Sequence, residues 1–386
     1  RPPRSTLFPY TTLFRSMKII YLIPLGGYST DLRSDTLWGM LCWGIQHLWG
    51  SETLEAFIDK AATGQPEFVV SSAFPFKQHG KERIPFFPNP FKIAPNATPE
   101  EEETLLDIHR LRKTFKNIEW LGLEDFEAAL KGDLTGKTLL DRLRVENRIK
   151  KEADKEGFEF FPSGQTVRRT PPELEINSLT HNTIDRLRGG TLDLPALDSD
   201  DPERTAGQLF HAEEFFWRDI HDENNRTPNT GLFFLVHGDT DKIEPILNLF
   251  RHWGFGADRT TGKGFFDFVI EDFHFDEPKA SESNALFNLS LYHPTLDELR
   301  AFEKAEGCLQ YLLERREGYV GGYRERRQKQ PRLYFKEGSV FLRPEGFIGR
   351  SMGCIRQQED FKAPKALPHK VWDNGFGLML NLKWNG

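Results

Sequence analysis

A pattern of strand, helix and strand occurs twice along this chain and limits the folds open to it. The first copy begins with the apolar stretch KIIYLIPL at residues 18–25 and continues into a helix over residues 34–49. Apolar side chains recur on nearly every face of that helix, which predicts burial on most sides. Ser34 is expected to cap the N-terminus of the helix, and Asp35 to complement its dipole. A short strand over residues 67–76 closes the first copy.

The second copy consists of a strand over residues 231–236, a helix over 241–252 and a strand over 265–270. Between this helix and the last strand lies the stretch WGFGADRTTGKGFF, residues 253–266, which is rich in glycine, basic side chains and hydroxyls. Such a composition is typical of phosphate-binding loops. Nucleotide-binding loops, however, join a strand to the helix after it, so that the helix N-terminus faces the phosphate. Here the order is helix, loop, strand.

The spacing inside this loop also argues against a mononucleotide site. A P-loop has four residues between its glycines, followed by Gly-Lys and a hydroxyl residue that reaches magnesium. Here Gly256 and Gly262 enclose five residues, and Lys263 is followed by Gly264. The dinucleotide fingerprint fails as well, because Arg259 stands where its third glycine is required. The loop is therefore expected to serve another purpose.

The two strand–helix–strand halves predict an α+β fold with two ferredoxin-like (RRM-like) domains, the topology that RNA-recognition modules also use. We expect an N-terminal domain over residues 17–205 and a C-terminal domain over 206–386, with the glycine-rich loop at 254–264 in the second. The charged segment over about 98–157 predicts a solvated helical insertion. The polar segment over about 163–204 is interrupted by Pro, Gly and Asp, which predicts an extended hairpin or a loop.

Residues 1–16, RPPRSTLFPYTTLFRS, lack the apolar core of a signal peptide and resemble translated adapter or vector sequence. We expect this leader to be non-native and the natural chain to begin at Met17. Cys42, Cys308 and Cys354 show no pairing pattern, which predicts a cytoplasmic protein. No apolar run approaches the roughly twenty residues of a membrane span. The net charge of −7 restricts nucleic-acid binding to a local basic groove.

The sequence predicts no catalytic residue, no metal site and no cofactor. The 11 histidines and 3 cysteines show no spacing typical of zinc sites. His47 lies in an apolar stretch between Trp43 and Trp49, which favours a packed or partly buried side chain over a catalytic base. His181 has no second histidine or activating carboxylate at a suitable spacing.

Two features lie closer to the C-terminus. Asn374-Gly375 stands between apolar runs, which is a hairpin signal. The stretch GYRERRQKQPRLYFK, residues 322–336, is the strongest basic patch in this acidic chain. It is either a solvated face or a surface for RNA or for the acidic surface of a partner. Its cations are Arg324, Arg326, Arg327, Lys329, Arg332 and Lys336.

Several separate stretches together resemble the RAMP superfamily of CRISPR-associated proteins and, within it, the family of subunit four of the type III-A (Csm) effector complex. The resemblance extends from Met17 to the C-terminus and is weakest in the helical insertion. The glycine-rich stretch alone marks only the superfamily, whereas the combination is more specific. The stretches are SDTLWGMLCWGI, HNTIDRLRGG, GQLFHAEEFFW, GFGADRTTGKGFF and VWDNGFGLMLNL.

This resemblance implies a non-catalytic subunit that grips the repeat-derived 5′ handle of the guide RNA. Its implied partners are the guide RNA, the large polymerase-like Cas subunit and the backbone subunit of the Csm complex, with no membrane. The segment around 163–204 is then similar to the thumb-like hairpin that kinks the guide. The glycines are expected to admit phosphates close to the main chain. The expected RNA-binding residues are Arg33, Ser34, His181, Asn182, Arg186, Gly254, Gly256, Arg259, Thr260, Thr261, Gly262, Lys263 and Gly264.

The main alternative is an enzyme of the same superfamily, a metal-independent endoribonuclease that processes CRISPR repeats. It would use His47 or His181 with a lysine, and it would share the fold and the glycine-rich loop. The Ser-Asp-Thr-Leu start of the first helix favours the RNA-binding subunit. So does the lack of a histidine in the loop after the first strand.

Overall fold

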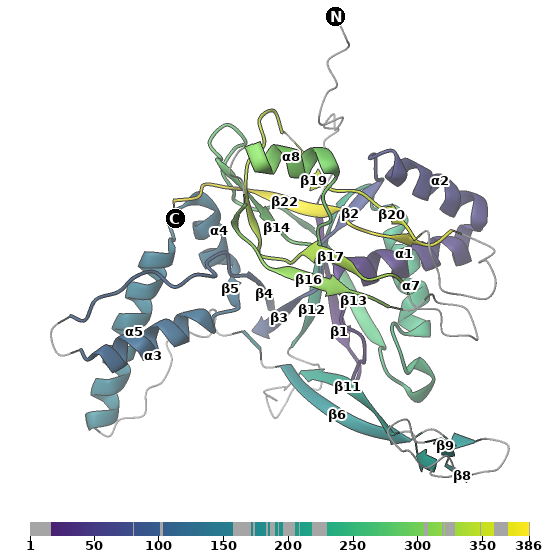
Figure 1. Cartoon of the computed structure of the whole chain (residues 1–386), viewed down its shortest axis with the longest axis horizontal. Coiled ribbons are helices and arrows are strands. Elements are labelled where there is room, and N and C mark those ends of the chain that lie inside the picture. The colour runs from purple at the N-terminus through teal and green to yellow at the C-terminus, as the bar shows by residue number, and fades with distance from the viewer. Residues whose placement is uncertain are drawn as a thin grey trace, which may run out of the picture.

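Two antiparallel sheets, one of seven strands and one of five, form the centre of the described part of the protein (Figure 1). The fold is therefore mixed α and β, as expected at that level. The computed structural model describes residues 17–79, 81–100, 103–156, 171–172, 174–182, 184–185, 190–191, 193–195, 205–207, 209–217, 230–304, 308–318, 320, 329–347, 349–358 and 370–385.

The larger sheet is built around β1 (Met17–Pro24), which lies between β12 (Thr230–Gly238) and β13 (Phe266–Phe273). Ile20 pairs with Phe234 of β12 on one side and with Ile270 of β13 on the other. Strands more than 200 positions apart in sequence thus share one sheet. The division expected at residues 205 and 206 cuts this sheet, because it separates β1 from both of its neighbours.

The strand expected over residues 67–76 is two strands, β2 (Phe68–Val70) and β3 (Phe74–His79). Both pair with β12, one after the other, and the break falls at residues 71–73. At the break the amide of Leu235 donates to Oγ of Ser71 at 2.9 Å, so a side chain replaces one backbone partner of β12. The sheet then continues through β4 (Glu82–Pro88) and β5 (Trp120–Gly122).

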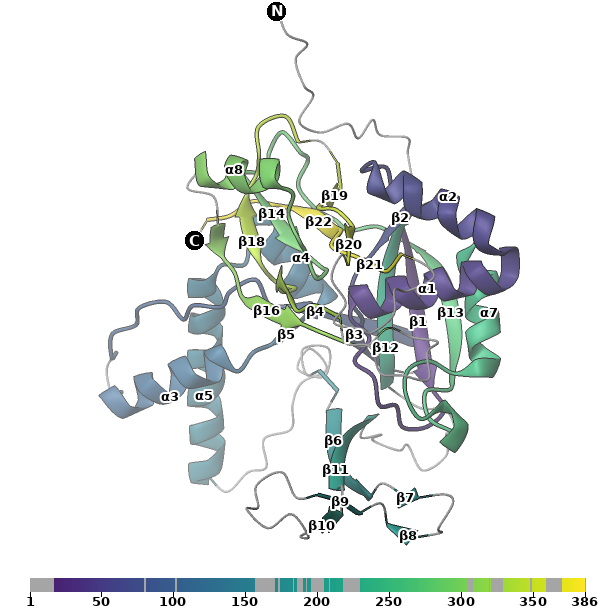
Figure 2. The ribbon, with the colours of Figure 1, turned by 45° about the vertical axis from the view of Figure 1, so that its right-hand side comes forward.

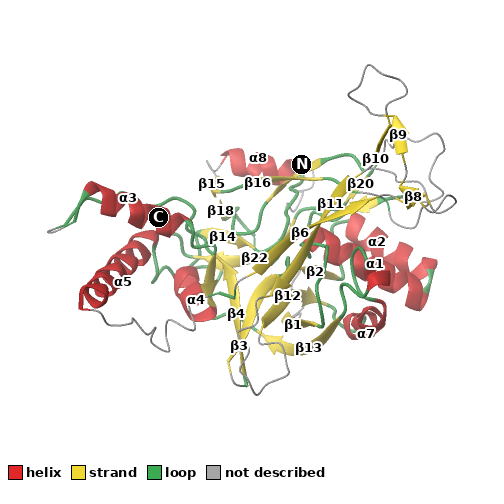
Figure 3. Cartoon of the chain, turned by 90° about the horizontal axis from the view of Figure 1, so that it is seen from below, coloured by secondary structure: helices red, strands yellow, loops and turns green. Residues whose placement is uncertain are grey.

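Helices α1 (Ser34–Trp49), α2 (Ser51–Ala62) and α7 (Ile243–Trp253) lie together beside the larger sheet (Figures 1 and 3). Gly44 permits the close approach of α1 and α7, because a Cβ there would lie 2.3 Å from Cγ2 of Ile246. α1 is buried on most sides along its first three turns, as expected, but Trp43 and the residues of its last turn are exposed.

The smaller sheet has the order β15-β18-β14-β22-β19, and α8 (Leu296–Lys304) follows its central strand. The expected hairpin at Asn374-Gly375 is wrong, because β21 (Trp372–Asp373) pairs with β20 (Arg356–Gln357) and not with β22. Asn374 is buried and its Oδ1 accepts the amide of Phe376. The five strands are β14 (Ala285–Asn288), β15 (Cys308–Gln310), β18 (Val340–Leu342), β19 (Ser351–Met352) and β22 (Gly377–Leu382).

A separate ribbon pairs β16 (Leu313–Arg316) with β17 (Arg332–Phe335).

The predicted helical insertion contains α3 (Leu105–Lys116), α4 (Leu123–Lys131) and α5 (Gly136–Glu156), with β5 between the first two. α3 and α5 extend away from the sheets (Figure 2). α4 instead packs on the core, where Phe126 stacks on Phe87 with ring centroids 4.6 Å apart. No helix within the described ranges has both the length and the apolar character needed to cross a membrane.

A long two-stranded ribbon of β6 (Leu174–Asn182) and β11 (Leu209–Trp217) projects from the body of the protein (Figures 1 and 2). Shorter strand pairs lie at its outer end. Most of the stretch GQLFHAEEFFW, namely Leu209–Trp217, is therefore a strand. The shorter strands are β7 (Ile184–Asp185), β8 (Gly190–Thr191), β9 (Asp193–Pro195) and β10 (Thr205–Gly207).

Candidate nucleic-acid interface

The glycine-rich loop connects α7 to β13, which confirms the predicted order of helix, loop and strand. The loop closes on itself, since the amide of Phe255 donates to the carbonyl of Gly264 at 2.9 Å. It is also attached to the segment after β1, because the amide of Gly264 donates to the carbonyl of Gly27 at 3.0 Å. The helix that precedes it ends at this loop, so no helix N-terminus faces a phosphate there.

The glycines of the loop are required by its own backbone. Gly254, Gly256, Gly262 and Gly264 have φ of 71°, 75°, 90° and 73°, in the left-handed region that other residues rarely adopt. A Cβ at Gly256 would lie 2.2 Å from Oγ1 of Thr30, and one at Gly264 would lie 2.1 Å from the carbonyl oxygen of Phe255. The composition that suggested a phosphate cradle is therefore largely explained by the turn itself.

The outer part of the loop carries the groups that are free to meet a ligand. Arg259 and Thr260 are exposed within a short 3-10 helix, and no described carboxylate pairs with Arg259. The stem of Arg259 lies against Gly254, with Cγ 3.4 Å from the position of a Cβ there. The hydroxyl of Thr261 already donates to the carbonyl of Asp258 at 2.7 Å. Arg259 is thus the cation that the loop presents outward.

Lys263, the other expected phosphate ligand of the loop, is engaged within the protein. Its Nζ lies 3.2 Å from Oε1 of Glu214 on β11, and the two side chains are only 15% and 12% exposed. The pair attaches the glycine-rich loop to the projecting ribbon. Lys263 therefore positions these two elements relative to each other.

Aromatic side chains complete the junction between the loop and the ribbon. Tyr28 and Phe215 exchange two backbone hydrogen bonds, of 3.2 and 2.8 Å, and their rings stack with centroids 5.4 Å apart. Phe255 of the glycine-rich loop lies against Tyr28 at 5.9 Å. Gly27 must be small, because a Cβ there would lie 2.7 Å from the ring of Phe216. The base of the ribbon is thereby fixed beside the loop.

The other expected residues of the ribbon lie farther out. His181 pairs with Phe210 and Asn182 with Leu209, near the outer end of β6. His181 stands five positions after Ile176, which pairs with Phe215 at the base, so the two levels are roughly 16 Å apart along the strand. The structure therefore does not bring His181 next to the glycine-rich loop. Arg186 lies outside the described residues.

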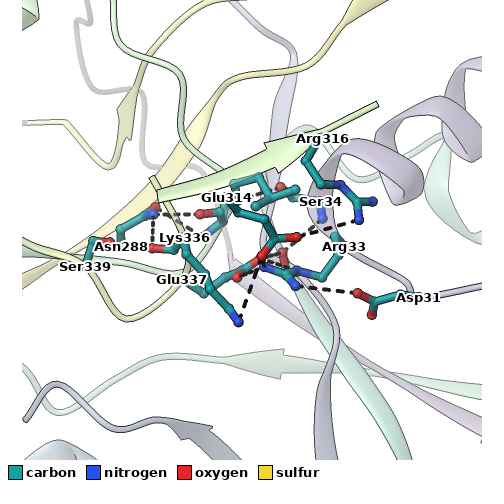
Figure 4. A network of polar contacts seen from close by, with 12 residues as sticks. Asp31, Arg33, Ser34, Asn288, Glu314, Arg316, Lys336, Glu337 and Ser339 are labelled. Atoms are coloured by element: carbon teal, nitrogen blue, oxygen red, sulfur yellow. Dashed lines mark hydrogen bonds and ion pairs between the residues drawn. The ribbon is translucent and has the colours of Figure 1, made fainter. Parts of the chain in front are cut away.

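Arg33 and Ser34 occupy the contact between the two sheets (Figure 4). Arg33 Nε donates to Glu337 at 2.8 Å and its Nη2 donates to Glu314 at 3.0 Å. Ser34 is fully buried, and its Oγ accepts the amide of Leu291 at 2.8 Å. Ser34 therefore does not cap α1, since its hydroxyl is committed to Leu291, which lies shortly after β14 of the smaller sheet. The N-cap position belongs to Arg33, whose side chain makes no capping bond.

The charges of this network largely satisfy one another. Burial opposes the charge on Arg33, but the carboxylates of Glu337, Asp31 and Glu314 outweigh it and raise the pKa of the guanidinium. Arg316 of β16 donates to Asp35 at 3.1 Å, across the same contact. Arg33 thus remains charged and is held by carboxylates, which leaves it poorly placed to bind a phosphate.

The basic stretch near the C-terminus is also partly engaged. Nζ of Lys329 lies 3.0 Å from Asp373, and Nε of Arg332 lies 2.9 Å from the other oxygen of that carboxylate. Both cations therefore attach the stretch to the strand β21. Arg324, Arg326 and Arg327 lie outside the described residues. Within the described ranges, no group of three or more His, Cys, Asp or Glu residues is arranged to hold a metal ion.

Comparison with known proteins connects this arrangement to one CRISPR-associated family. Residues 281–382 match the family model of the CRISPR Csm4 C-terminal domain, and these residues span the smaller sheet from β14 to β22. The CRISPR system Cms protein Csm4 of Thermococcus onnurineus (strain NA1) is 22% identical over 340 residues, which cover 86% of this chain and 89% of that protein.

Solved structures extend the likeness to the fold of nearly the whole chain. A chain of a Csm3-Csm4 subcomplex of the type III-A CRISPR-Cas interference complex aligns with a TM-score of 0.55 and 16% identity, covering 96% of this chain and 100% of that chain. A chain of a Csm1-Csm4 cassette in complex with cA4 aligns with a TM-score of 0.53 and 18% identity, covering 96% and 99%. The chain resembles Csm4. The resemblance predicted from the sequence is thereby confirmed.

The sequence did not reveal several residues that build the candidate interface. Thr30 bonds the amide of Ala257 at 3.0 Å, and Gly27 and Tyr28 contact the ribbon. Two adjacent glycines and a tyrosine directly after a strand were a signal of close backbone packing. Glu337 and Glu314, two of the carboxylates that hold Arg33, gave no such signal, because they lie 304 and 281 positions away in sequence.

His47 differs from its expectation in one respect. It is exposed, and its ring stacks on Trp43 at 5.7 Å and meets the edge of Trp253 at 4.8 Å. The side chain is packed between aromatic rings, as expected, but on the surface of α1 and α7. Trp253 immediately precedes the glycine-rich loop.

Proposed function

We propose that this protein is a non-catalytic RNA-binding subunit of a type III-A CRISPR interference complex and that it holds the repeat-derived 5′ handle of the guide RNA. The proposal includes docking to the large Cas subunit and to the backbone subunit. The similarity to Csm4 supports it, since solved structures contain Csm4 in a cassette with Csm1 and in a subcomplex with Csm3.

One observation carries the RNA-binding part of this proposal. An exposed Arg259, with no described carboxylate paired to it, lies on a loop whose shape is fixed by glycines and which abuts the base of a projecting ribbon. An exposed guanidinium of this kind suits a phosphate, because its planar set of N–H donors matches phosphate oxygens. Contacts to the backbone position a nucleic acid without reading its sequence.

The finer description of the fold belongs to the same proposal. The order β13-β1-β12-β2 in the larger sheet and the order β22-β14-β18-β15 in the smaller one are equivalent when each set is numbered along the chain, namely 4-1-3-2. This is the order of the ferredoxin-like fold. We infer one ferredoxin-like unit from β1 to β13, with the ribbon and the helical insertion placed within it, and a second from β14 to β22.

The test is a tagged pull-down of residues 17–386, co-expressed with the CRISPR array and the neighbouring genes, followed by sequencing of the bound RNA. We expect the large Cas subunit to be recovered with guides that share one repeat-derived 5′ end. Arg259→Ala should retain less guide and lower the salt dependence of binding by about one phosphate contact. Arg300→Ala on α8, where the side chain is 69% exposed, is the matched control and should change neither.

The enzyme of the same superfamily gives a different result. Recovery of the protein alone, with cleaved repeat RNA that a His47→Ala variant leaves intact, would make this chain a processing endoribonuclease. If Arg259→Ala and Arg300→Ala lose guide RNA to the same extent, the glycine-rich loop is not part of the RNA-binding site.

A further inference from the structure

Three aromatic side chains form a surface cluster beside the glycine-rich loop. Trp43 and His47 lie one turn apart on α1, and Trp253 is the last residue of α7. The rings of Trp43 and His47 are stacked with an interplanar angle of 25°, and Trp253 meets His47 nearly edge-on at 78°. We call these three residues the aromatic cluster.

The aromatic cluster is not needed to complete the core. Trp43 and Trp253 are each 44% exposed, whereas the residues through which α1 and α7 pack, such as Ile45 and Ile246, are fully buried. Two half-exposed indoles gather on adjoining helices instead of standing singly, and apolar side chains gathered on a surface can mark a binding site. The cluster therefore needs an occupant to explain it.

The cluster is continuous with the outward-facing part of the loop. Trp253 is followed directly by Gly254, and the stem of Arg259 lies back over Gly254, 3.4 Å from the position of a Cβ there. The stem of Arg259 thus lies over the residue that directly follows Trp253. A cation beside a row of exposed aromatic rings is the arrangement with which proteins bind single-stranded nucleic acids.

We propose that the aromatic cluster stacks on nucleobases of the same RNA whose phosphate backbone contacts the side chain of Arg259. This inference rests on the proposed function and extends the RNA site from the loop onto α1 and α7. A base has two flat apolar faces, so an exposed indole can cover one of them without reading the sequence. His47 supports both indoles and holds them apart, which makes it a positioning residue.

The experiment measures binding of the purified full chain to a single-stranded RNA with the repeat-derived 5′ sequence of the neighbouring array, at several salt concentrations. The double variant Trp43→Ala/Trp253→Ala should raise the dissociation constant about tenfold or more, as loss of base stacking does. Its salt dependence should be unchanged, because no charge is removed. Trp43→Phe/Trp253→Phe should restore most of the affinity and lose part of the quenching of tryptophan fluorescence by RNA.

Two controls separate this inference from the proposed function. Trp49→Ala removes an indole that is 40% exposed on the same helix and has no ring contact with the aromatic cluster, so it should bind RNA as the unaltered chain does. Arg259→Ala reports on the loop alone. If Arg259→Ala weakens binding and the tryptophan variants do not, the stacking inference is wrong and the proposed function stands.

Two other outcomes overturn the inference. If neither kind of variant weakens binding, the RNA site itself lies elsewhere. If the tryptophan variants keep their RNA but lose the large Cas subunit in the pull-down, the aromatic cluster is a protein-docking surface. Thermal unfolding of each variant shows that the chain is folded before binding is compared.

Discussion

Gly256 and Gly264 differ from Gly262 in what surrounds them, although all three have positive φ. At the first two positions a Cβ would meet Thr30 and the backbone of Phe255, whereas at Gly262 nothing lies within 4 Å. A side chain at Gly262 would therefore cost only the left-handed conformation. At Gly264 the cost of that conformation is joined by a steric clash with main-chain atoms, which cannot rotate away as a side chain can.

This difference predicts unequal losses of stability. Gly262→Ala should lower the free energy of unfolding by about 1–2 kcal/mol, the cost of left-handed backbone for an L-residue. Gly264→Ala should lower it by about 2–5 kcal/mol, because overpacking adds about 1–3 kcal/mol. Urea unfolding of the two variants measures both values. Equal losses would mean that the backbone near Phe255 yields to the new methyl group.

At the scale of helices and strands, local signals predicted the elements and distant contacts decided their roles. The strand β1, the helices α1 and α7 and the loop before β13 all follow from apolar periodicity and glycine placement. Which strands belong to the larger sheet could not be predicted in this way, because β1 pairs with β12 across some 200 residues. The hydroxyl of Ser34 likewise serves Leu291, a partner that no local pattern indicates.

The same distinction applies to Lys263, whose partner lies on another element. If it attaches the glycine-rich loop to the ribbon through Glu214, then Lys263→Met and Glu214→Gln should loosen both segments alike. Hydrogen exchange measured by mass spectrometry should become faster over residues 209–217 and 254–264 in each variant, since each leaves a mostly buried group unpaired. The charge-reversed pair Lys263→Glu/Glu214→Lys should slow it again.

A direct phosphate contact predicts otherwise. Lys263→Met would then weaken RNA binding without changing hydrogen exchange in the free chain. Glu214→Gln would strengthen binding, because it removes a negative charge beside the RNA. The Glu214→Gln variant therefore decides between the two roles: faster hydrogen exchange supports the attachment of loop to ribbon, and stronger RNA binding with unchanged exchange supports the phosphate contact.

In the whole molecule, residues of both sheets contribute to the larger of two hydrophobic clusters, and a polar contact also joins the sheets. Phe126 of the helical insertion packs against Phe287 of the smaller sheet with centroids 5.2 Å apart. Ser290 beside the smaller sheet donates to the carbonyl of Val70 in the larger one at 2.8 Å. The sheets are thus joined more closely than two domains on a linker, and the glycine-rich loop and the C-terminal region that matches the Csm4 family model belong to one body.

The ion network around Arg33 is the charged part of this contact, and its members should be energetically coupled. Glu337 is 7% exposed and also accepts the hydroxyl of Ser72, so the removal of Arg33 leaves a buried carboxylate without its cation. Arg33→Met should therefore lower the free energy of unfolding by about 3 kcal/mol, as expected when one partner of a buried ion pair is removed. Glu337→Gln should cost somewhat less, because Arg33 keeps Glu314 at 3.0 Å.

The double variant Arg33→Met/Glu337→Gln should lose less than the sum of the two single losses, because the second substitution removes the charge that the first one leaves unpaired. Urea unfolding of the four chains gives the coupling energy, and Glu345→Gln, an exposed carboxylate near the smaller sheet, should change stability by less than about 0.5 kcal/mol. Salt should alter the coupling little, since screening acts mainly on exposed charges. If the two single losses in the free energy of unfolding add up strictly, Arg33 and Glu337 are not coupled. The contact between the two sheets would then depend on their shared apolar core.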